Sequence, residues 1–179
     1  MKKGGIGGGK TITGLRFESR ISLTKALERI SGYSVKNGIV YYEDNEVARL
    51  YQKHDLYKNL LKPSKIDYSK IISKKLLPDE AILVKKDNVL FIVEIKFQMV
   101  TGSVDEKLQT CDFKNKQYNK LLSSLGISVK YVYVLSDWFK KPEYKDVLEY
   151  IACVGCYYFF NEVPLKFLGL PNLDNSQKD

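Results

Sequence analysis

Two carboxylates and one lysine near the middle of the chain, Asp79, Glu94 and Lys96, are the residues whose types and spacing best suit chemistry. They lie on two apolar, β-branched runs that flank Asp87-Asn88, a pair typical of a two-residue hairpin turn. Such a turn places Ala81 opposite Glu94 and Asp79 opposite Lys96. Because side chains alternate between the faces of a strand, the three groups should converge on one face at the open end of the hairpin.

The same register excludes a neighbouring carboxylate. Glu80 would pair with Ile95 and point to the opposite face, so the pairing selects Asp79 rather than Glu80. A simpler interpretation is a cross-strand ion pair between Asp79 and Lys96, worth less than about 1 kcal/mol if it is exposed. However, Glu94 and Lys96 interrupt an otherwise apolar strand, where buried charge is costly unless a metal ion or a partner compensates it.

Two acids and an amine at one point favour metal-assisted hydrolysis. Asp79, Glu94 and the carbonyl of Ile95 would hold one or two Mg²⁺ ions, which orient a scissile phosphate and lower the pKa of bound water. Lys96 would position or help deprotonate that water and offset charge in the transition state. The chain has a single histidine, His54, so a metal site should use carboxylates and a hard cation rather than histidines and zinc.

Periodicity and turn signals predict the elements that must position these residues. The hairpin's second strand is apolar on both faces until Glu94, which is typical of a central strand. Residues 65–76 fit either a helix or a strand. We predict helices at 14–31, 54–62, 103–125 and 143–151, and further strands at 39–43, 46–51, 127–135 and 156–161. The helix at 103–125 should begin with a capping box of Ser103 and Glu106 and end at Gly126.

These elements make one mixed α/β domain over residues 1–179, with a central mixed sheet flanked by helices. Residues 1–13 are predicted to form a flexible, glycine-rich arm, and residues 171–179 a frayed tail. Gly4–Thr11 formally fits a phosphate-binding loop. Too few residues precede it for the buried strand that such a loop requires, so the flexible arm is favoured.

The order and spacing of the two acids and the lysine resemble the signature of a known protein family. Pro78-Asp79 followed by Glu94-Ile95-Lys96 resembles the PD-(D/E)xK nuclease signature. The stretches T-G-L-R-F-E, residues 13–18, and G-S-V-D-E-K-L-Q-T-C, residues 102–111, are similar to type II restriction endonucleases of the HinfI-like group. The likeness spans residues 11–135, with 33–75 and 136–179 poorly matched.

The resemblance implies a restriction-endonuclease-like αβββαβ core and a Mg²⁺-dependent type II restriction endonuclease. Such an enzyme cuts double-stranded DNA at a short specific site, here of the GANTC type. A homodimer would cut both strands of a near-symmetric site. A cognate DNA methyltransferase is the implied functional partner. The alternatives are a repair or Holliday-junction-type endonuclease, and a non-catalytic DNA-binding module of the same fold.

Further residues are candidates for the metal site, for phosphate contacts or for DNA binding. In the family a glutamate on the first helix assists the metal, and Glu18 takes that place; the alternative is a solvated helix carboxylate. Gln98 shares the parity of Lys96 and would contact the phosphate or order water, unless it is a plain strand-end residue. Positive side chains that would bind DNA phosphates, or else are simply solvated, are Lys10, Lys107, Lys114, Lys116 and Lys120.

Composition supports the same class. The 179 residues carry a formal net charge of +8, which favours polyanionic partners, nucleic acid first. No apolar run is long enough to span a membrane, and no secretory signal is evident. Three cysteines cannot form a disulfide framework, so we predict a reduced, cytoplasmic protein.

The cysteines offer competing chemistry. Cys153-x-x-Cys156 runs from a helix into a strand, the reverse of a thioredoxin-type site, and zinc would need Cys111 and His54 to converge. We therefore expect the cysteines to pack in the core.

Overall fold

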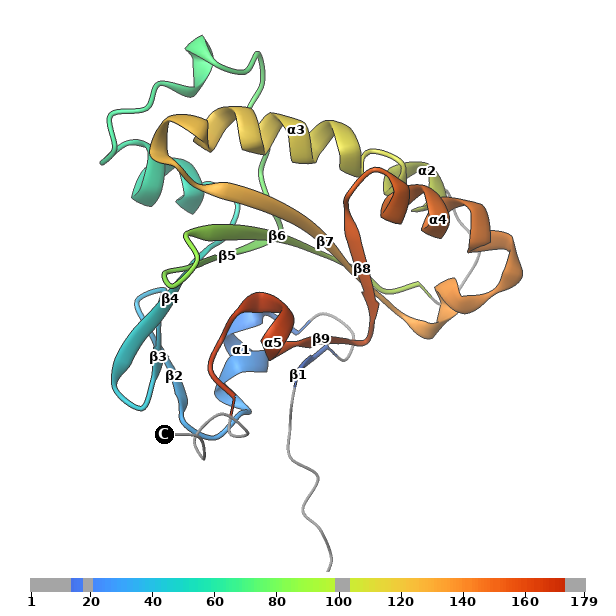
Figure 1. The fold of residues 1–179 in the computed structure, drawn as a ribbon, viewed down its shortest axis with the longest axis horizontal. Coiled ribbons are helices and arrows are strands. Elements are labelled where there is room, and N and C mark those ends of the chain that lie inside the picture. The colour runs from blue at the N-terminus through green and yellow to red at the C-terminus, as the bar shows by residue number, and fades with distance from the viewer. Residues whose placement is uncertain (1–13, 18–20, 99–103, 173–179) are drawn as a thin grey trace, which may run out of the picture.

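A seven-stranded mixed sheet forms the centre of the computed structural model, which describes residues 14–17, 21–98 and 104–172 (Figure 1). The strands lie side by side in chain order, antiparallel from the first to the fifth and parallel over the last three. They are β2 (Tyr33–Lys36), β3 (Ile39–Tyr42), β4 (Asn45–Tyr51), β5 (Glu80–Val84), β6 (Val89–Lys96), β7 (Ser128–Leu135) and β8 (Tyr157–Phe160).

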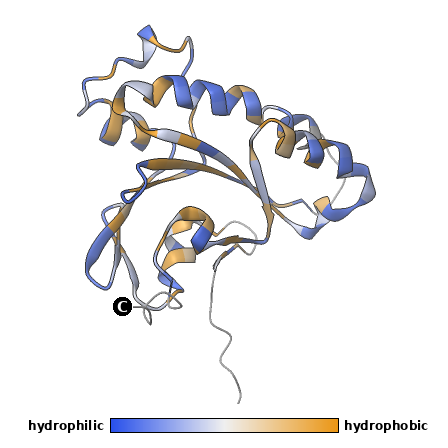
Figure 2. Cartoon of the chain, viewed as in Figure 1, coloured by the Kyte–Doolittle hydropathy of each residue, from blue (hydrophilic) through white to orange (hydrophobic). Residues whose placement is uncertain are grey.

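Helices cover both faces of this sheet, which confirms the predicted mixed α/β fold (Figure 1). One face packs against α2 (Val104–Leu108), α3 (Cys111–Leu122) and α4 (Lys145–Cys153). The opposite face packs against α1 (Leu23–Glu28), α5 (Leu165–Leu168) and a two-stranded sheet of β1 (Gly14–Arg16) and β9 (Glu162–Pro164). Figure 2 shows the central strands mostly hydrophobic and α3 largely hydrophilic, as expected for strands covered on both sides.

Strand β6 occupies the predicted central position, between β5 and β7. Leu90 and Ile92 face α3, whereas Phe91 and Val93 face α1 and α5, and all four are buried. This alternation also sets the direction of the polar residues that follow. Glu94 and Lys96 continue the parity of Ile92 and therefore lie on the α3 face.

The predicted hairpin register is wrong by two residues. Glu80 pairs with Val93 rather than with Ile95, and the pairing ends at Val84 and Val89. The turn contains four residues instead of two. Asn88 lies at φ +50°, its backbone N–H donates to the carbonyl of Lys85 across the turn, and its side chain donates to the carbonyl of Gly126 at 2.9 Å. A shift of two residues preserves the face of every side chain, so the selection of Asp79 over Glu80 survives the error.

The predicted helix at 14–31 is also wrong at its start. Leu15 and Phe17 are buried while Arg16 is exposed, which is the two-residue period of a strand, and Arg16 forms an ion pair with Glu162 of β9 at 3.0 Å. A Cβ atom on Gly14 would lie 2.3 Å from the Glu162 carboxylate, so glycine permits this close pairing. The helix itself covers only Leu23–Glu28, after Ser22 as its N-cap.

The other elements are confirmed with smaller changes. The helix predicted at 103–125 divides into α2, α3 and a 3-10 turn, Ser123–Leu125, before Gly126 at φ +64°. Ser103 lies outside the described residues. Residues 54–62 contain a π-helix, Leu56–Leu61, and the ambiguous 65–76 stretch holds a single 3-10 turn, Tyr68–Lys70. Two further 3-10 turns, Asp137–Lys140 and Pro142–Tyr144, precede α4.

The chain ends are described only in part. The predicted arm, residues 1–13, and most of the predicted tail, 173–179, lie outside the described residues. Within the tail, the carbonyl of Pro171 accepts a hydrogen bond from the Tyr33 hydroxyl. Among the described residues, no helix is both long and apolar enough to cross a membrane.

Candidate active site

Asp79, Glu94 and Lys96 meet at the open end of the β5–β6 hairpin, on the face of the sheet that α3 covers. The Lys96 ammonium lies 2.9 Å from Oε2 of Glu94 and 3.4 Å from Oδ2 of Asp79. The predicted convergence therefore occurs, although Asp79 lies just before β5 rather than within a ladder pair. The two carboxylates attract positive charge, and the Lys96 ammonium occupies the position between them.

Glu94 is the buried centre of this cluster, with its side chain only 9% exposed. Its Oε1 accepts hydrogen bonds from Lys114 Nζ of α3, at 2.7 Å, and from the Tyr131 hydroxyl of β7. Burial alone would raise the pKa of Glu94, but Lys96, Lys114 and Tyr131 outweigh it, and the pKa lies below its usual value. Glu94 is thus held as a carboxylate inside the protein.

Lys96, the positive partner of Glu94, is likewise held in its charged form. Burial would lower the pKa of Lys96, but the charges of Glu94 and Asp79 reverse this effect and raise the pKa above its usual value. The Asp79 side chain is 54% exposed, against 22% for Lys96, so the cluster runs from a buried acid to an acid at the surface. The cluster is therefore open to solvent on the Asp79 side.

The carbonyl of Ile95 faces the same open end. The carbonyl of Lys96 accepts a hydrogen bond from Ser136 N, just beyond β7. Since successive carbonyls of a strand point to opposite edges, that of Ile95 points toward β5. The β5–β6 ladder ends at Glu80 and Val93, so this carbonyl is directed past the end of that ladder.

The donor set suits a hard cation. Two carboxylates and a backbone carbonyl are oxygen ligands, and Mg²⁺ usually takes one or two carboxylates, with water and phosphate oxygens completing its shell. Binding would require the Lys96 ammonium to withdraw from between Asp79 and Glu94. In the parts of the chain that the structure describes, no group of three or more histidine, cysteine or acidic residues could hold a metal ion.

Glu80, the acid excluded by the register, lies on the other face. It is buried, and both its carboxylate oxygens accept from Gln52 Nε2, at 2.8 and 2.9 Å. Burial raises the pKa of Glu80, and the hydrogen bond from Gln52 offsets this only in part. The chain therefore has two adjacent acids in opposite environments, of which only Asp79 belongs to the cluster.

Gln98 and Glu18 were predicted to assist the metal site or the phosphate. The structure places the backbone of Gln98 and does not describe Glu18. The backbone N–H of Gln98 donates to Ser136 Oγ at 3.3 Å, and its carbonyl accepts from the same hydroxyl at 3.2 Å. Gln98 thus continues the line of β6 beside the end of β7. Glu18 lies outside the described residues, and the observed first helix begins only at Leu23.

The lysines predicted to bind DNA phosphates divide into different environments. Lys114 points inward to Glu94 and is 29% exposed. Lys116 is exposed and pairs with Asp112 at 2.8 Å. Lys107 and Lys120 are exposed, and Lys10 lies outside the described residues.

Sequence reasoning missed two groups that hold Glu94, namely Lys114 and Tyr131. A signal for Lys114 was present, because it lies three residues after Cys111 and four before Tyr118 on the buried stripe of its helix. A lysine on an apolar stripe predicts a buried counter-charge. Tyr131 shares its face with Tyr133 on β7, but a strand position alone does not predict which acid its hydroxyl reaches.

Cys111 and Cys156 pack in the core as predicted, but the prediction is wrong for Cys153, and the C-x-x-C pair gains no support. Cys153 is exposed, whereas Cys156 is buried and hydrogen-bonds with the thiol of Cys111, which raises the pKa of Cys156. His54 lies in a different place, at the edge of a hollow formed by residues 54–75. Cysteine packing therefore joins α3 to the start of β8.

Comparisons of the chain with protein-family models, with curated proteins and with solved structures found no match.

Proposed function

We propose that this protein is a Mg²⁺-dependent endodeoxyribonuclease that hydrolyses phosphodiester bonds of double-stranded DNA at a short specific site. The observation that carries the proposal is the Lys96 ammonium between Asp79 and Glu94 at the open end of the β5–β6 hairpin, where Asp79 is exposed. This trio has the residue types and order of the PD-(D/E)xK signature. The order of α1, β4–β6, α3 and β7 supports an αβββαβ core of the restriction-endonuclease type.

Each residue has a distinct part in the proposed reaction. Asp79, Glu94 and the Ile95 carbonyl would hold Mg²⁺, which supplies Lewis-acid activation of the phosphate and a more acidic bound water. Lys96, released from its bridging position, would hold the attacking water and offset the charge that develops on the phosphate oxygens. Lys114 and Tyr131 keep Glu94 ionised and fix its direction, so they are positioning residues.

In its most specific form the proposal is a type II restriction enzyme that acts as a homodimer and whose cognate DNA methyltransferase protects the host sites. The test is incubation of supercoiled plasmid and mixed genomic DNA with the purified protein in Mg²⁺ or EDTA. Discrete fragments that form only with Mg²⁺, and whose sequenced ends share one short motif, are the expected result. Cleavage confined to branched or damaged DNA would indicate a repair or junction endonuclease instead.

One observation favours a second candidate, a non-catalytic DNA-binding module. Both oxygens of Glu94 already have cationic partners, Lys96 and Lys114, so the cluster is also a satisfied ion-pair network. Binding of DNA without cleavage in Mg²⁺, Mn²⁺ or Ca²⁺ would support this candidate over the nuclease.

The two adjacent acids give a matched test of the proposed metal site. Asp79→Asn should lower the cleavage rate about a hundredfold or more, because it removes a metal ligand at the accessible end of the cluster. Glu80→Gln should leave the rate within about threefold, because Glu80 lies on the opposite face and its raised pKa makes a neutral replacement mild. Cleavage rates over a range of Mg²⁺ concentrations provide the measurement, and equal losses in the two variants would contradict the assignment of Asp79.

A further inference from the structure

The segment that joins β4 to β5 has a strongly positive net charge. Between residues 53 and 75 it has seven lysines against two aspartates, with no arginine or glutamate, and so a net charge of +5. The whole chain has +8. All seven lysines are exposed. Charge of one sign concentrated on one segment attracts a polyanion.

This segment forms a hollow of about 500 Å³, which we call the basic hollow. Its walls include two tyrosines, Tyr57 and Tyr68, and four lysines, Lys58, Lys62, Lys65 and Lys75. The two tyrosine rings meet edge to face with centroids 5.3 Å apart. The Lys75 ammonium lies 4.8 Å from the centroid of Tyr68 and 5.4 Å from that of Tyr57. Cation–π contacts thus hold the positive charge of Lys75 beside the two tyrosine rings.

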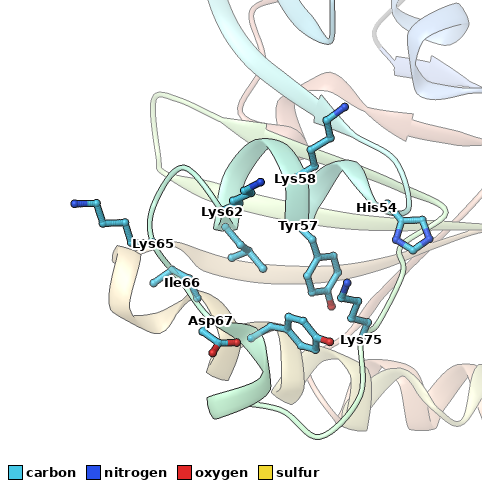
Figure 3. A pocket seen from close by; sticks show the side chains of 10 residues that line it. His54, Tyr57, Lys58, Lys62, Lys65, Ile66, Asp67 and Lys75 are labelled. Carbon is cyan, nitrogen blue, oxygen red and sulfur yellow. The ribbon is translucent and has the colours of Figure 1, made fainter.

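The other three lysines form an exposed rim around the hollow. Among the described residues, no salt bridge involves Lys58, Lys62 or Lys65. The nearby Asp67 carboxylate is engaged by the backbone N–H of Ser69, at 3.1 Å, and by its hydroxyl, at 2.7 Å. Figure 3 shows Lys58 and Lys65 extending away from the Tyr57 ring, which suits an extended anionic ligand better than a small enclosed one.

The basic hollow is attached directly to the candidate active site. The Tyr57 hydroxyl donates to the carbonyl of Leu76 at 3.0 Å and accepts from its N–H at 2.9 Å. The carbonyl of Pro78, one residue before Asp79, accepts from Lys53 N at 2.8 Å. These bonds fix the chain that runs from the hollow into Asp79.

Side-chain packing also connects the basic hollow to the face of the sheet that carries the candidate active site. Leu56, Tyr57 and Leu61 share a core cluster with Tyr118 and Leu121 of α3, on the sheet face that carries Glu94. Burial raises the pKa of Tyr118, and electrostatic interactions with Tyr57, Glu94 and Asp79 raise it further. The hollow and the cluster are therefore neighbours on one face of the molecule.

We propose that the basic hollow binds the phosphate backbone of duplex DNA, with contacts from Lys58, Lys62, Lys65 and Lys75 beside Asp79. The inference rests on the proposed function in taking DNA as the ligand. A backbone of regularly spaced phosphates matches several outward-pointing ammonium groups, each of which replaces a counterion on the DNA.

The test measures binding without cleavage. A fluorescently labelled DNA duplex is titrated with protein in EDTA at several salt concentrations, and anisotropy gives the dissociation constant. The variant K58A/K62A/K65A is compared with the wild type and with a charge-matched control, K25A/K36A/K166A. The control removes exposed lysines from α1, β2 and α5, none of which lines the hollow.

The rim variant should weaken binding by about tenfold or more, and the slope of log affinity against log salt should become shallower by about three, because three phosphate contacts are lost. The control variant should bind as the wild type does. Equal weakening in both variants would overturn the proposal, since only net charge would then matter. Capture of anionic phospholipid vesicles in place of DNA, lost in the rim variant, would also overturn it.

The outcomes separate this inference from the proposed function. Rim-dependent DNA binding by a protein that never cuts DNA with Mg²⁺ would support the basic hollow and contradict the nuclease. Site-specific cutting by a rim variant that binds like the wild type would support the nuclease and overturn the hollow.

Discussion

Lys96→Met is expected to lower the rate of Mg²⁺-dependent DNA cleavage by about a thousandfold while the affinity for DNA in EDTA changes less than about threefold. Removing a single group that stabilises developing charge typically costs a hundredfold to a thousandfold. Lys96 would in addition hold the attacking water, so the larger loss is expected. Single-turnover cleavage of a labelled duplex, with protein in excess, separates this chemical step from binding.

Lys96 contacts one carboxylate oxygen of Glu94, whereas Lys114 and Tyr131 contact the other. In the Lys96→Met variant Glu94 keeps Lys114 and Tyr131 as partners, so its charge remains compensated and the fold should persist. Thermal unfolding provides that check. Lys86→Met, in the exposed turn of the same hairpin, is the matched control and should cleave at the wild-type rate. Cleavage by Lys96→Met at a rate near that of the wild type would refute the site.

Lys114→Met gives a further contrast, because Lys114 contacts Glu94 but not Asp79. As a positioning residue it should affect the rate less than Lys96 does. Its loss should also raise the pKa of Glu94 and so move the acid side of the pH–rate profile toward higher pH. A profile that keeps its acid limb unchanged would show that Lys114 has no influence on Glu94 during the reaction.

How far the sequence predicted this cluster depends on which physical signal each residue carried. The parity of Glu94 and Lys96 on an apolar strand was enough to place them on one face, and the side-chain period of two made the result insensitive to the two-residue register error. The turn itself was not predictable from Asp87-Asn88. In the observed four-residue turn the Asn88 side chain donates to the carbonyl of Gly126, a contact distant in sequence that the local pattern does not reveal.

The first described residues also show that a local sequence pattern cannot always decide between a helix and a strand. Leu15, Phe17 and Ile21 fit a helical or a strand period over so short a run, and the choice was made by pairing with β9, almost 150 residues later. Tyr131 likewise reaches Glu94 only because β7 runs parallel to β6. Local patterns therefore predicted the elements and their faces, whereas long-range pairing decided boundaries and the partners of the buried acid.

Glu94→Gln is expected to lower the free energy of unfolding by about 3 kcal/mol or more at pH 7, in EDTA. The substitution keeps the shape of the side chain but removes the counter-charge that Lys96 and Lys114 share, and it leaves Lys96 with Asp79 alone. Breaking a buried ion pair from one side typically costs about 3–5 kcal/mol. Guanidinium denaturation measures the loss. Glu28→Gln, an exposed acid on α1, is the control and should stay within about 0.5 kcal/mol.

The same variant has a defined pH dependence. The pKa of Glu94 in the folded protein lies below its usual value of about 4.3, so its contribution to stability is fully present above that value and is lost as the pH falls through the folded pKa. The difference between wild type and Glu94→Gln should consequently be constant near neutral pH and shrink in acid. The double variant E94Q/K114M should recover part of the loss, because it removes the Lys114 ammonium that Glu94→Gln alone leaves without its carboxylate partner. A small difference that does not change with pH, and no recovery in the double variant, would mean that the cluster contributes no net stability and that Glu94 is not its charged centre.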